Sequence, residues 1–353
     1  MKILLLLKFL ILLLVFASCT SKLEPSEIYE KYEKSVVLIR HDYFYYLELK
    51  DGSQFYFVLN ENNEIDYATF DKNEIIKYPM SLTGTGFFVS KDGLLATNMH
   101  VTIPSADESF DVFKSIQDYL KDNPDIADNK INELVDNYNY YENELTKLNL
   151  TEDKIKENKE YSIKYEQDYY FWDELKKDNF LVNEENSEFY FETVLMGIAY
   201  NNSFAIESDD YKECIILDSE DNTENPIDLA LIQLKDKTTP LAIKDVFLLD
   251  GSDKNKLKIN DKIYMIGFNY GTDIGNTTEG LKNQITQGTV SQEPDKNRVL
   301  YSIPTLVGSS GSPVINEFGE LVAINYSGYD ETQGFNYGIP SKHLKELINT
   351  LKK

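Results

Sequence analysis

Hydrophobic and polar residues alternate with the period of a β-strand over much of the chain. Residues 35–39 predict a first strand, and aromatic alternation over residues 43–58 predicts a hairpin that turns at Asp51-Gly52. The same pattern predicts further strands at residues 86–89, 94–97, 193–199, 214–217, 229–234, 262–267, 284–291 and 321–325. Many short strands separated by turn residues favour an all-β double β-barrel over a parallel α/β sheet.

The middle of the chain has a different period. Between about residues 109 and 179, apolar residues such as Ile131, Leu134 and Tyr138 recur at helical spacing with charged residues between them. We therefore expect a large helical, acidic insertion over about residues 107–188, with a break at Asn123-Pro124. A solvated helical projection with one packed face is the favoured interpretation, and a dedicated binding module is the alternative.

The C-terminal residues predict one more helix, over residues 341–351, with Ser341 as its N-cap. The sequence contains no convincing internal repeat and no low-complexity linker. The expected architecture is therefore a double β-barrel with a helical insertion and a C-terminal helix.

Composition excludes several classes of function. The 353 residues are 42% hydrophobic, which is enough for a substantial core, and 60 acidic against 35 basic residues give a net charge of -25. That charge argues against nucleic acid or an anionic membrane surface as an electrostatic partner. Two cysteines and three histidines argue against a disulfide scaffold and a metal centre, so we expect no metal and no cofactor. The acidic stretch 218–225 lacks the residue spacing of an EF-hand.

The first eighteen residues have the layout of a secretory signal, with two lysines and an apolar run that ends in Ala17-Ser18. Phe-Ala-Ser-Cys at residues 16–19 resembles the lipobox of bacterial lipoproteins, which implies a lipid on Cys19. A plain signal peptide cleaved near Ala17 is the alternative. We expect a signal peptide at 1–18, a tether at 19–30 and one domain at 31–353. The expected location is the cell envelope, with the exported protein anchored to a membrane through Cys19.

Three residues at strand boundaries carry the candidate chemistry. His100 follows one predicted strand, Asp228 precedes another, and Ser310 lies in a glycine-rich turn that leads into a third. A serine hydroxyl needs an imidazole to remove its proton, and the imidazole needs a carboxylate to orient it. His100 would be the base, Asp228 the orienting acid and Ser310 the nucleophile. The main-chain N–H groups of Gly308 and Ser310 would form the oxyanion hole.

These segments resemble those of chymotrypsin-fold serine proteases, most closely the bacterial trypsin-like peptidases related to the DegP/HtrA family. The matching segments are Thr-Asn-Met-His-Val at 97–101, Asp-Leu-Ala-Leu-Ile at 228–232 and Gly-Ser-Ser-Gly-Ser-Pro at 308–313. The resemblance implies two perpendicular barrels with the site in the cleft between them, and a protein or peptide substrate. Three features depart from the family: Asp228 follows His100 by 128 positions, a hairpin region precedes Gly84, and no PDZ module is expected after Ser341.

By register with that family, the resemblance implies a primary substrate pocket formed by Pro304, Thr305, Asn325, Tyr326, Ser327 and Gly338. None of these residues is charged, so we expect a small or medium apolar preference rather than a basic one. The pocket histidine of glutamyl endopeptidases falls where Asn325 stands. Ser309 replaces the aspartate that pairs with a freed N-terminus in zymogen-activated relatives, which argues against activation by that route.

Two functions stay open at this stage. A serine endopeptidase is favoured, and a catalytically silent trypsin-fold lipoprotein acting as a binding or scaffold protein is the alternative. A lipase or esterase is disfavoured because α/β-hydrolases place the serine first in the chain. Cys214 lies in an apolar run, so we interpret it as a small buried hydrophobe rather than a nucleophile. The oligomeric state is left open.

Overall fold

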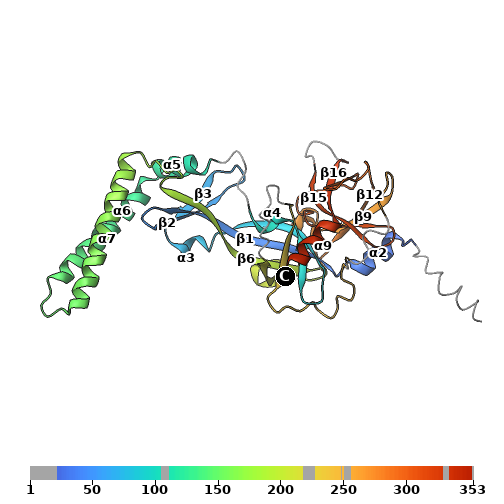
Figure 1. The fold of residues 1–353 in the computed structure, drawn as a ribbon, viewed down its shortest axis with the longest axis horizontal. Coiled ribbons are helices and arrows are strands. Elements are labelled where there is room, and N and C mark those ends of the chain that lie inside the picture. The colour runs from blue at the N-terminus through green and yellow to red at the C-terminus, as the bar shows by residue number, and fades with distance from the viewer. Residues whose placement is uncertain are drawn as a thin grey trace, which may run out of the picture. The chain divides into compact units, whose positions relative to one another are not determined.

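The structure is a computed structural model that describes residues 22–104, 111–217, 227–247, 249, 256–328 and 334–351. The chain divides into two compact units (Figure 1). Unit 1 comprises Met1–His41, Leu82–Ile103 and Leu195–Lys353, and unit 2 comprises Asp42–Ser81 and Pro104–Val194. The predicted signal peptide and Cys19 lie outside the described residues.

A closed ring of six strands forms the first barrel. Its strands, in ring order, are β1 (Val36–Leu49), β4 (Met80–Phe88), β5 (Leu94–Thr97), β8 (Ala230–Leu234), β7 (Lys212–Leu217) and β6 (Ser187–Tyr200), and β6 pairs again with β1. Closure leaves no free edge in the ring. In the β5–β8 ladder Thr97 lies opposite Ala230. The chain therefore leaves β5 and enters β8 at the same end of the ladder.

A second sheet of six strands follows in unit 1. Its order is β12 (Gln284–Thr289), β9 (Lys262–Gly267), β14 (Pro313–Asn316), β15 (Leu321–Gly328), β16 (Asn336–Pro340) and β13 (Val299–Tyr301). A bridge between Val290 and Tyr301 joins its two outer strands. The predicted double β-barrel is confirmed, as are the helical insertion and the C-terminal helix α9 (Ser341–Thr350). Pro340, rather than Ser341, is the N-cap of α9.

Short elements occupy the connections. They are α4 (Met99–Thr102), the 3-10 helix η1 (Ser208–Asp210), α8 (Gly271–Gly275), β10 (Asn276–Thr277) and β11 (Gly280–Leu281). Helix α4 directly follows β5 and contains His100. No helix among the described residues is both long enough and apolar enough to cross a bilayer.

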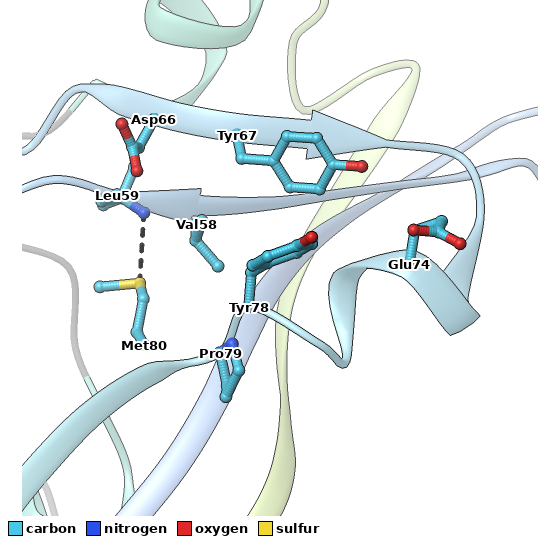
Figure 2. Close-up of a pocket in the computed structure, with 8 residues that line it drawn as sticks. All are labelled: Val58, Leu59, Asp66, Tyr67, Glu74, Tyr78, Pro79 and Met80. Carbon is cyan, nitrogen blue, oxygen red and sulfur yellow. Dashed lines mark hydrogen bonds between the residues drawn. The ribbon is translucent and has the colours of Figure 1, made fainter.

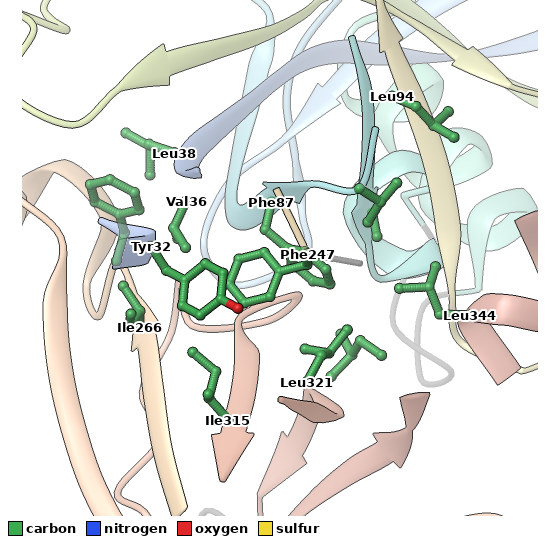
Figure 3. Packing of buried hydrophobic residues seen from close by; sticks show 14 of the residues in the cluster. Tyr32, Val36, Leu38, Phe87, Leu94, Phe247, Ile266, Ile315, Leu321 and Leu344 are labelled. Carbon is green, nitrogen blue, oxygen red and sulfur yellow. The ribbon is translucent and has the colours of Figure 1, made fainter. Parts of the chain in front are cut away.

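The core of unit 1 collects apolar side chains from both barrels and from two helices (Figure 3). Tyr32 stacks on Phe247 with ring centroids 4.2 Å apart, and its hydroxyl donates to the main-chain oxygen of Gly319 at 2.8 Å. Tyr32 ends helix α2 (Pro25–Tyr32), which lies partly within the tether expected at residues 19–30. Ile28, one turn earlier, is fully buried. The tether does not extend to Glu30, because Ile28 and Tyr32 share one apolar helix face.

Unit 2 combines two separate stretches of the chain. The hairpin region contributes β2 (Gln54–Leu59), β3 (Ile65–Thr69) and α3 (Lys72–Ile75), and the insertion contributes α5 (Val112–Asp122), α6 (Pro124–Leu145) and α7 (Glu152–Lys177). Helices α6 and α7 lie side by side (Figure 1). The break predicted at Asn123-Pro124 is confirmed, since α5 ends at Asp122 with Asn123 as its C-cap and α6 begins at Pro124.

The two stretches of unit 2 share buried aromatic side chains. Trp172 of α7 is fully buried, lies 5.2 Å from the ring of Phe70, and donates its indole N–H to Asp51 at 2.8 Å. Phe55 of β2 lies 6.4 Å from Tyr119 of α5. The helical insertion is therefore not a free-standing projection, because the hairpin region supplies part of its core.

Candidate active site

His100 and Asp228 meet where β5 ends and β8 begins. The Asp228 carboxylate contacts the histidine twice: Oδ2 lies 2.7 Å from His100 Nδ1, and Oδ1 accepts the main-chain N–H of His100 at 3.0 Å. Asn98 donates its side-chain amide to the main-chain oxygen of Asp228 at 2.8 Å. A carboxylate can only accept, so Nδ1 carries a proton and Nε2 of the neutral ring is left as an acceptor.

Ser310 lies in the turn before β14, and Thr85 of β4 binds that turn at two points. The main-chain N–H of Thr85 donates to Ser310 O at 2.8 Å, and its hydroxyl donates to Gly308 O at 2.8 Å. Thr97, three residues before His100, donates its hydroxyl to Thr85 O at 2.9 Å. Short hydrogen-bonded steps therefore connect the strand that precedes His100 with the turn that holds Ser310.

Glycines permit this close approach. Gly308 and Gly311 have positive φ angles of 89° and 85°. A Cβ at Gly311 would overlap the main-chain oxygen of Thr85 and lie 2.5 Å from Thr97 Oγ1, and one at Gly308 would lie 2.5 Å from the main-chain oxygen of Phe268. A side chain at Gly311 would push the turn away from β4 and β5, and one at Gly308 would push it away from Phe268 and Gly271.

The remaining polar groups of the turn suit acyl transfer. In the part of the chain that the structure describes, the N–H groups of Gly308 and Ser310 donate to no protein acceptor. Such free N–H groups can bind an oxygen on which negative charge develops. Among the same residues His100 and Ser310 share no direct hydrogen bond, and such contacts often tighten only when substrate binds.

Some expected pocket residues support the turn rather than forming an open wall. Asn325 is 2% exposed, and its side chain is bound to Ser309 and Tyr301. Gly338, opposite Asn325 in the β15–β16 ladder, lies against the ring of Tyr301. Sequence reasoning missed Tyr301, because a single tyrosine in a short apolar strand carries no local sign of its partners.

The other expected pocket residues lie at the margins of the same region. Thr305 donates its hydroxyl to Asn336 Oδ1 at 2.8 Å, next to an exposed Pro304. Tyr326 is half-buried in β15. The side chain of Ser327 lies outside what the structure describes. Cleavage preference therefore stays a prediction.

A separate cavity of about 490 Å³ lies within unit 2 (Figure 2). Its lining residues are Val58, Leu59, Asp66, Tyr67, Glu74, Tyr78, Pro79 and Met80. The Tyr67 and Tyr78 rings meet edge to face at 5.5 Å, and Glu74 pairs with Lys77 at 2.6 Å. The lining contains no serine, histidine or cysteine, so the candidate acyl-transfer residues are elsewhere. Nor do the described residues contain a group of three or more His, Cys, Asp or Glu side chains that could hold a metal ion.

Comparison with known proteins agrees with the motifs. Residues 198–324 match the family model described as trypsin-like peptidase domain, a stretch that contains Asp228 and Ser310. The serine protease Do-like HtrA of Bacillus subtilis (strain 168) is 26% identical over 132 residues, which cover 35% of this chain and 28% of that protein. Exfoliative toxin A of Staphylococcus aureus is 29% identical over 128 residues, covering 35% of this chain and 43% of the toxin.

Two further comparisons are of the same kind. A probable periplasmic serine endoprotease, DegP-like, of Marinomonas sp. (strain MWYL1) is 29% identical over 136 residues, covering 37% of this chain and 26% of that protein. The crystal structure of the serine endoprotease from Yersinia pestis aligns with a TM-score of 0.43 at 13% identity, over 94% of this chain and 67% of that one. The chain spans less than half the length of the curated relatives it matches. The predicted resemblance to trypsin-like, DegP/HtrA-related peptidases is confirmed.

Proposed function

We propose that the protein is a serine endopeptidase that hydrolyses peptide bonds through Ser310, His100 and Asp228. The observation that carries the proposal is the two-point contact of Asp228 with the ring and the main chain of His100. Similarity to trypsin-like peptidases adds support, because the matched stretch includes the serine turn. The substrate class is protein or peptide.

The proposed reaction begins at the Ser310 hydroxyl. Its oxygen attacks the carbonyl carbon of the peptide bond while His100 Nε2 takes its proton, and Asp228 stabilises the imidazolium that forms. The oxyanion accepts hydrogen bonds from the N–H groups of Gly308 and Ser310. Collapse breaks the C–N bond, His100 returns its proton to the leaving amine, and an acyl-enzyme remains. Water, deprotonated by His100, then hydrolyses the ester and restores the Ser310 hydroxyl.

A fluorophosphonate probe tests this proposal directly. We expect mass spectrometry to find one adduct, on Ser310, and we expect Ser310→Ala to reduce casein hydrolysis by at least about 10³-fold. Ser312→Ala is the matched control, because its hydroxyl is buried without a hydrogen-bond partner among the described residues. Removing an unsatisfied hydroxyl should leave both labelling and folding nearly unchanged. An adduct elsewhere would overturn the assignment, and an unlabelled wild-type protein would favour the silent scaffold.

We propose in addition that the protein is exported and anchored by a lipid on Cys19. The support is the signal layout before Phe-Ala-Ser-Cys at 16–19, together with relatives named as probable periplasmic endoproteases. Wild-type protein should enter the detergent phase of a Triton X-114 separation, whereas Cys19→Ser should stay in the aqueous phase. Identical partitioning of the two proteins would refute the lipid anchor.

A further inference from the structure

Three buried polar side chains form a continuous hydrogen-bonded path beneath the serine turn. The Tyr301 hydroxyl lies 2.8 Å from Asn325 Oδ1, and Asn325 Nδ2 lies 3.0 Å from Ser309 O and 3.2 Å from Ser309 Oγ. The Ser309 hydroxyl donates in turn to Leu306 O at 2.6 Å. Tyr301, Asn325 and Ser309 are each no more than 2% exposed, so water does not compete for these bonds.

Chemistry determines how the Asn325 amide is oriented. The main-chain oxygen of Ser309 can only accept a hydrogen bond, so the amide nitrogen must face it. The amide oxygen then faces the Tyr301 hydroxyl, which is the donor and also lies 3.0 Å from the main-chain oxygen of Tyr337. Burial raises the pKa of Tyr301 well above its usual value of 10.0, which keeps that donor protonated.

The main chain of Asn325 binds the other side of the nucleophile. Its carbonyl accepts the N–H of Gly311 at 2.8 Å, and its own N–H donates to Ser312 O at 2.9 Å. Asn325 therefore contacts the residue before Ser310 through its side chain and the two residues after it through its main chain.

The contact with Ser309 O has a consequence for the oxyanion hole. Ser309 C=O and Ser310 N–H belong to one peptide unit, and in a planar trans peptide these two groups point in opposite directions. The Ser309 carbonyl accepts both Asn325 Nδ2 at 3.0 Å and the main-chain N–H of Ser312 at 3.1 Å. These two bonds together direct the Ser310 N–H away from the core. The Gly308 N–H is held in the same manner, because Val307 O, in the same peptide unit, accepts the N–H of Tyr270 at 2.6 Å.

We propose that Asn325 is a positioning residue that sets the direction of the Ser310 oxyanion-hole donor, with Tyr301 holding the Asn325 amide in place. The inference rests on the proposed function, and it assigns to Asn325 a task other than lining the substrate pocket. Asn325 would act on the rate of acylation without touching the substrate. The three residues of this hydrogen-bonded path, Tyr301, Asn325 and Ser309, all belong to the second barrel and the serine turn.

Asn325→Leu tests the inference, with Tyr301→Phe as a milder second variant. Asn283→Leu is the matched control: Asn283 is also buried, and its amide also donates to two main-chain oxygens, at 2.8 Å on Glu33 and 3.4 Å on Val36. The reaction followed is covalent labelling by a fluorophosphonate, separated into its maximal rate and its half-saturating concentration.

Asn325→Leu should lower the maximal labelling rate about 10- to 100-fold, somewhat less than the complete loss of an oxyanion donor. The half-saturating concentration should stay within about twofold, because ground-state contacts are unchanged. Tyr301→Phe should lower the rate by less, about two- to tenfold. Asn283→Leu should label at the wild-type rate. A normal rate in Asn325→Leu, or an equal fall in Asn283→Leu, overturns the inference.

Hydrogen exchange separates failure of this inference from failure of the proposed function. Main-chain amides of residues 306–312 should exchange faster in Asn325→Leu and Tyr301→Phe than in wild type, and at the wild-type rate in Asn283→Leu. If wild-type protein is not labelled at all, the proposed function fails and the exchange data alone decide whether Asn325 supports the turn. Unchanged exchange in both variants would overturn that role. Should Asn325→Leu fail to fold, Tyr301→Phe decides by the same two measurements.

Discussion

At the scale of single residues, Asp228 holds His100 by the ring and the main chain together. The 3.0 Å contact with the His100 main-chain N–H fixes the Asp228 carboxylate. Rotation of the His100 ring would then break the 2.7 Å contact between Nδ1 and the fixed carboxylate. The carboxylate therefore selects one tautomer as well as one orientation.

Asp228→Asn should consequently lower kcat/KM for peptide hydrolysis by about 10³- to 10⁴-fold. The amide that replaces the carboxylate can turn its NH₂ group toward Nδ1, which places the ring proton on Nε2. A protonated Nε2 cannot accept the proton of the Ser310 hydroxyl. The comparison is Asn98→Ala, which removes only the 2.8 Å contact with the Asp228 main chain and should cost far less activity. Similar losses of kcat/KM in the two variants would mean that Asp228 does not control the tautomer of His100.

Cys214 illustrates a buried group without a catalytic partner. It is a free cysteine on β7, and burial, with a smaller contribution from Asp236, raises the pKa of its thiol from 9.0 to about 12. The thiol form is inert as a nucleophile. We expect iodoacetamide at pH 7.5 to modify Cys214 only after urea unfolding. Rapid labelling of the native protein would contradict its burial.

The same shift has a defined pH dependence. The native state keeps the proton to higher pH than the unfolded state, so the stabilisation is complete below pH 9 and is lost as the pH rises toward 12. Urea denaturation should therefore show that the free energy of unfolding falls less between pH 8 and pH 10.5 for Cys214→Ala than for wild type. An equal fall in the free energy of unfolding of both proteins would mean that groups other than Cys214 cause the loss of stability at high pH.

At the scale of elements, the serine turn depends on how closely it approaches two strands of the first barrel. Gly311→Ala should lower the free energy of unfolding by more than about 2 kcal/mol, because it adds a steric overlap with Thr85 to the cost of a positive φ. Gly52→Ala is the control, since Gly52 has a φ of 80° and open space around its Cβ position. That variant should lose only about 1–2 kcal/mol. Urea denaturation measures both, and equal losses would show that the turn can move away from β4.

At the scale of the whole molecule, charge and core divide unevenly between the two units. Unit 2 contains 32 acidic and 13 basic residues, so it carries -19 of the net charge of -25. Its cluster around Phe44, Tyr56, Val58 and Ile75 is separate from the clusters of unit 1. Unit 1 therefore has core clusters of its own and carries the remaining -6 of the net charge.

Replacing Asp42–Ser81 and Pro104–Val194 by short Gly/Ser linkers shortens β1 and β6 but should leave a folded unit 1. All residues of the unit 1 core clusters lie outside these two segments, and short linkers cost little loop-closure entropy. Removing only residues 107–188 should be worse, because it takes away Trp172 and Tyr119 and exposes Phe70 and Phe55. Circular dichroism melting would show a cooperative transition for the double excision and loss or aggregation for the single one. The opposite ranking would place part of the barrel core in unit 2.

Local patterns along the chain determined the element types and the chemical candidates. The period-2 alternation identified most of the barrel strands, although not β13 or β16, and Asn123-Pro124 marked a helix boundary. Each of these signals depends on residues a few positions apart. His100, Asp228 and Ser310 could be singled out from their neighbours for the same reason. Helix α2 also had a local signal, because Pro25 begins it and the Glu27 carboxylate accepts the main-chain N–H of Glu24. Its polar surroundings, however, resembled a tether.

Only the tertiary structure decided which of these residues meet and what supports them. Asp228 reaches His100 across 128 positions, Thr85 binds Gly308 across 223, and Asn325 holds Ser309 from a neighbouring strand. The union of the hairpin region and the helical insertion in one unit likewise depends on packing between Phe70 and Trp172. Such contacts arise from barrel closure and side-chain packing between distant segments, and no local periodicity records them.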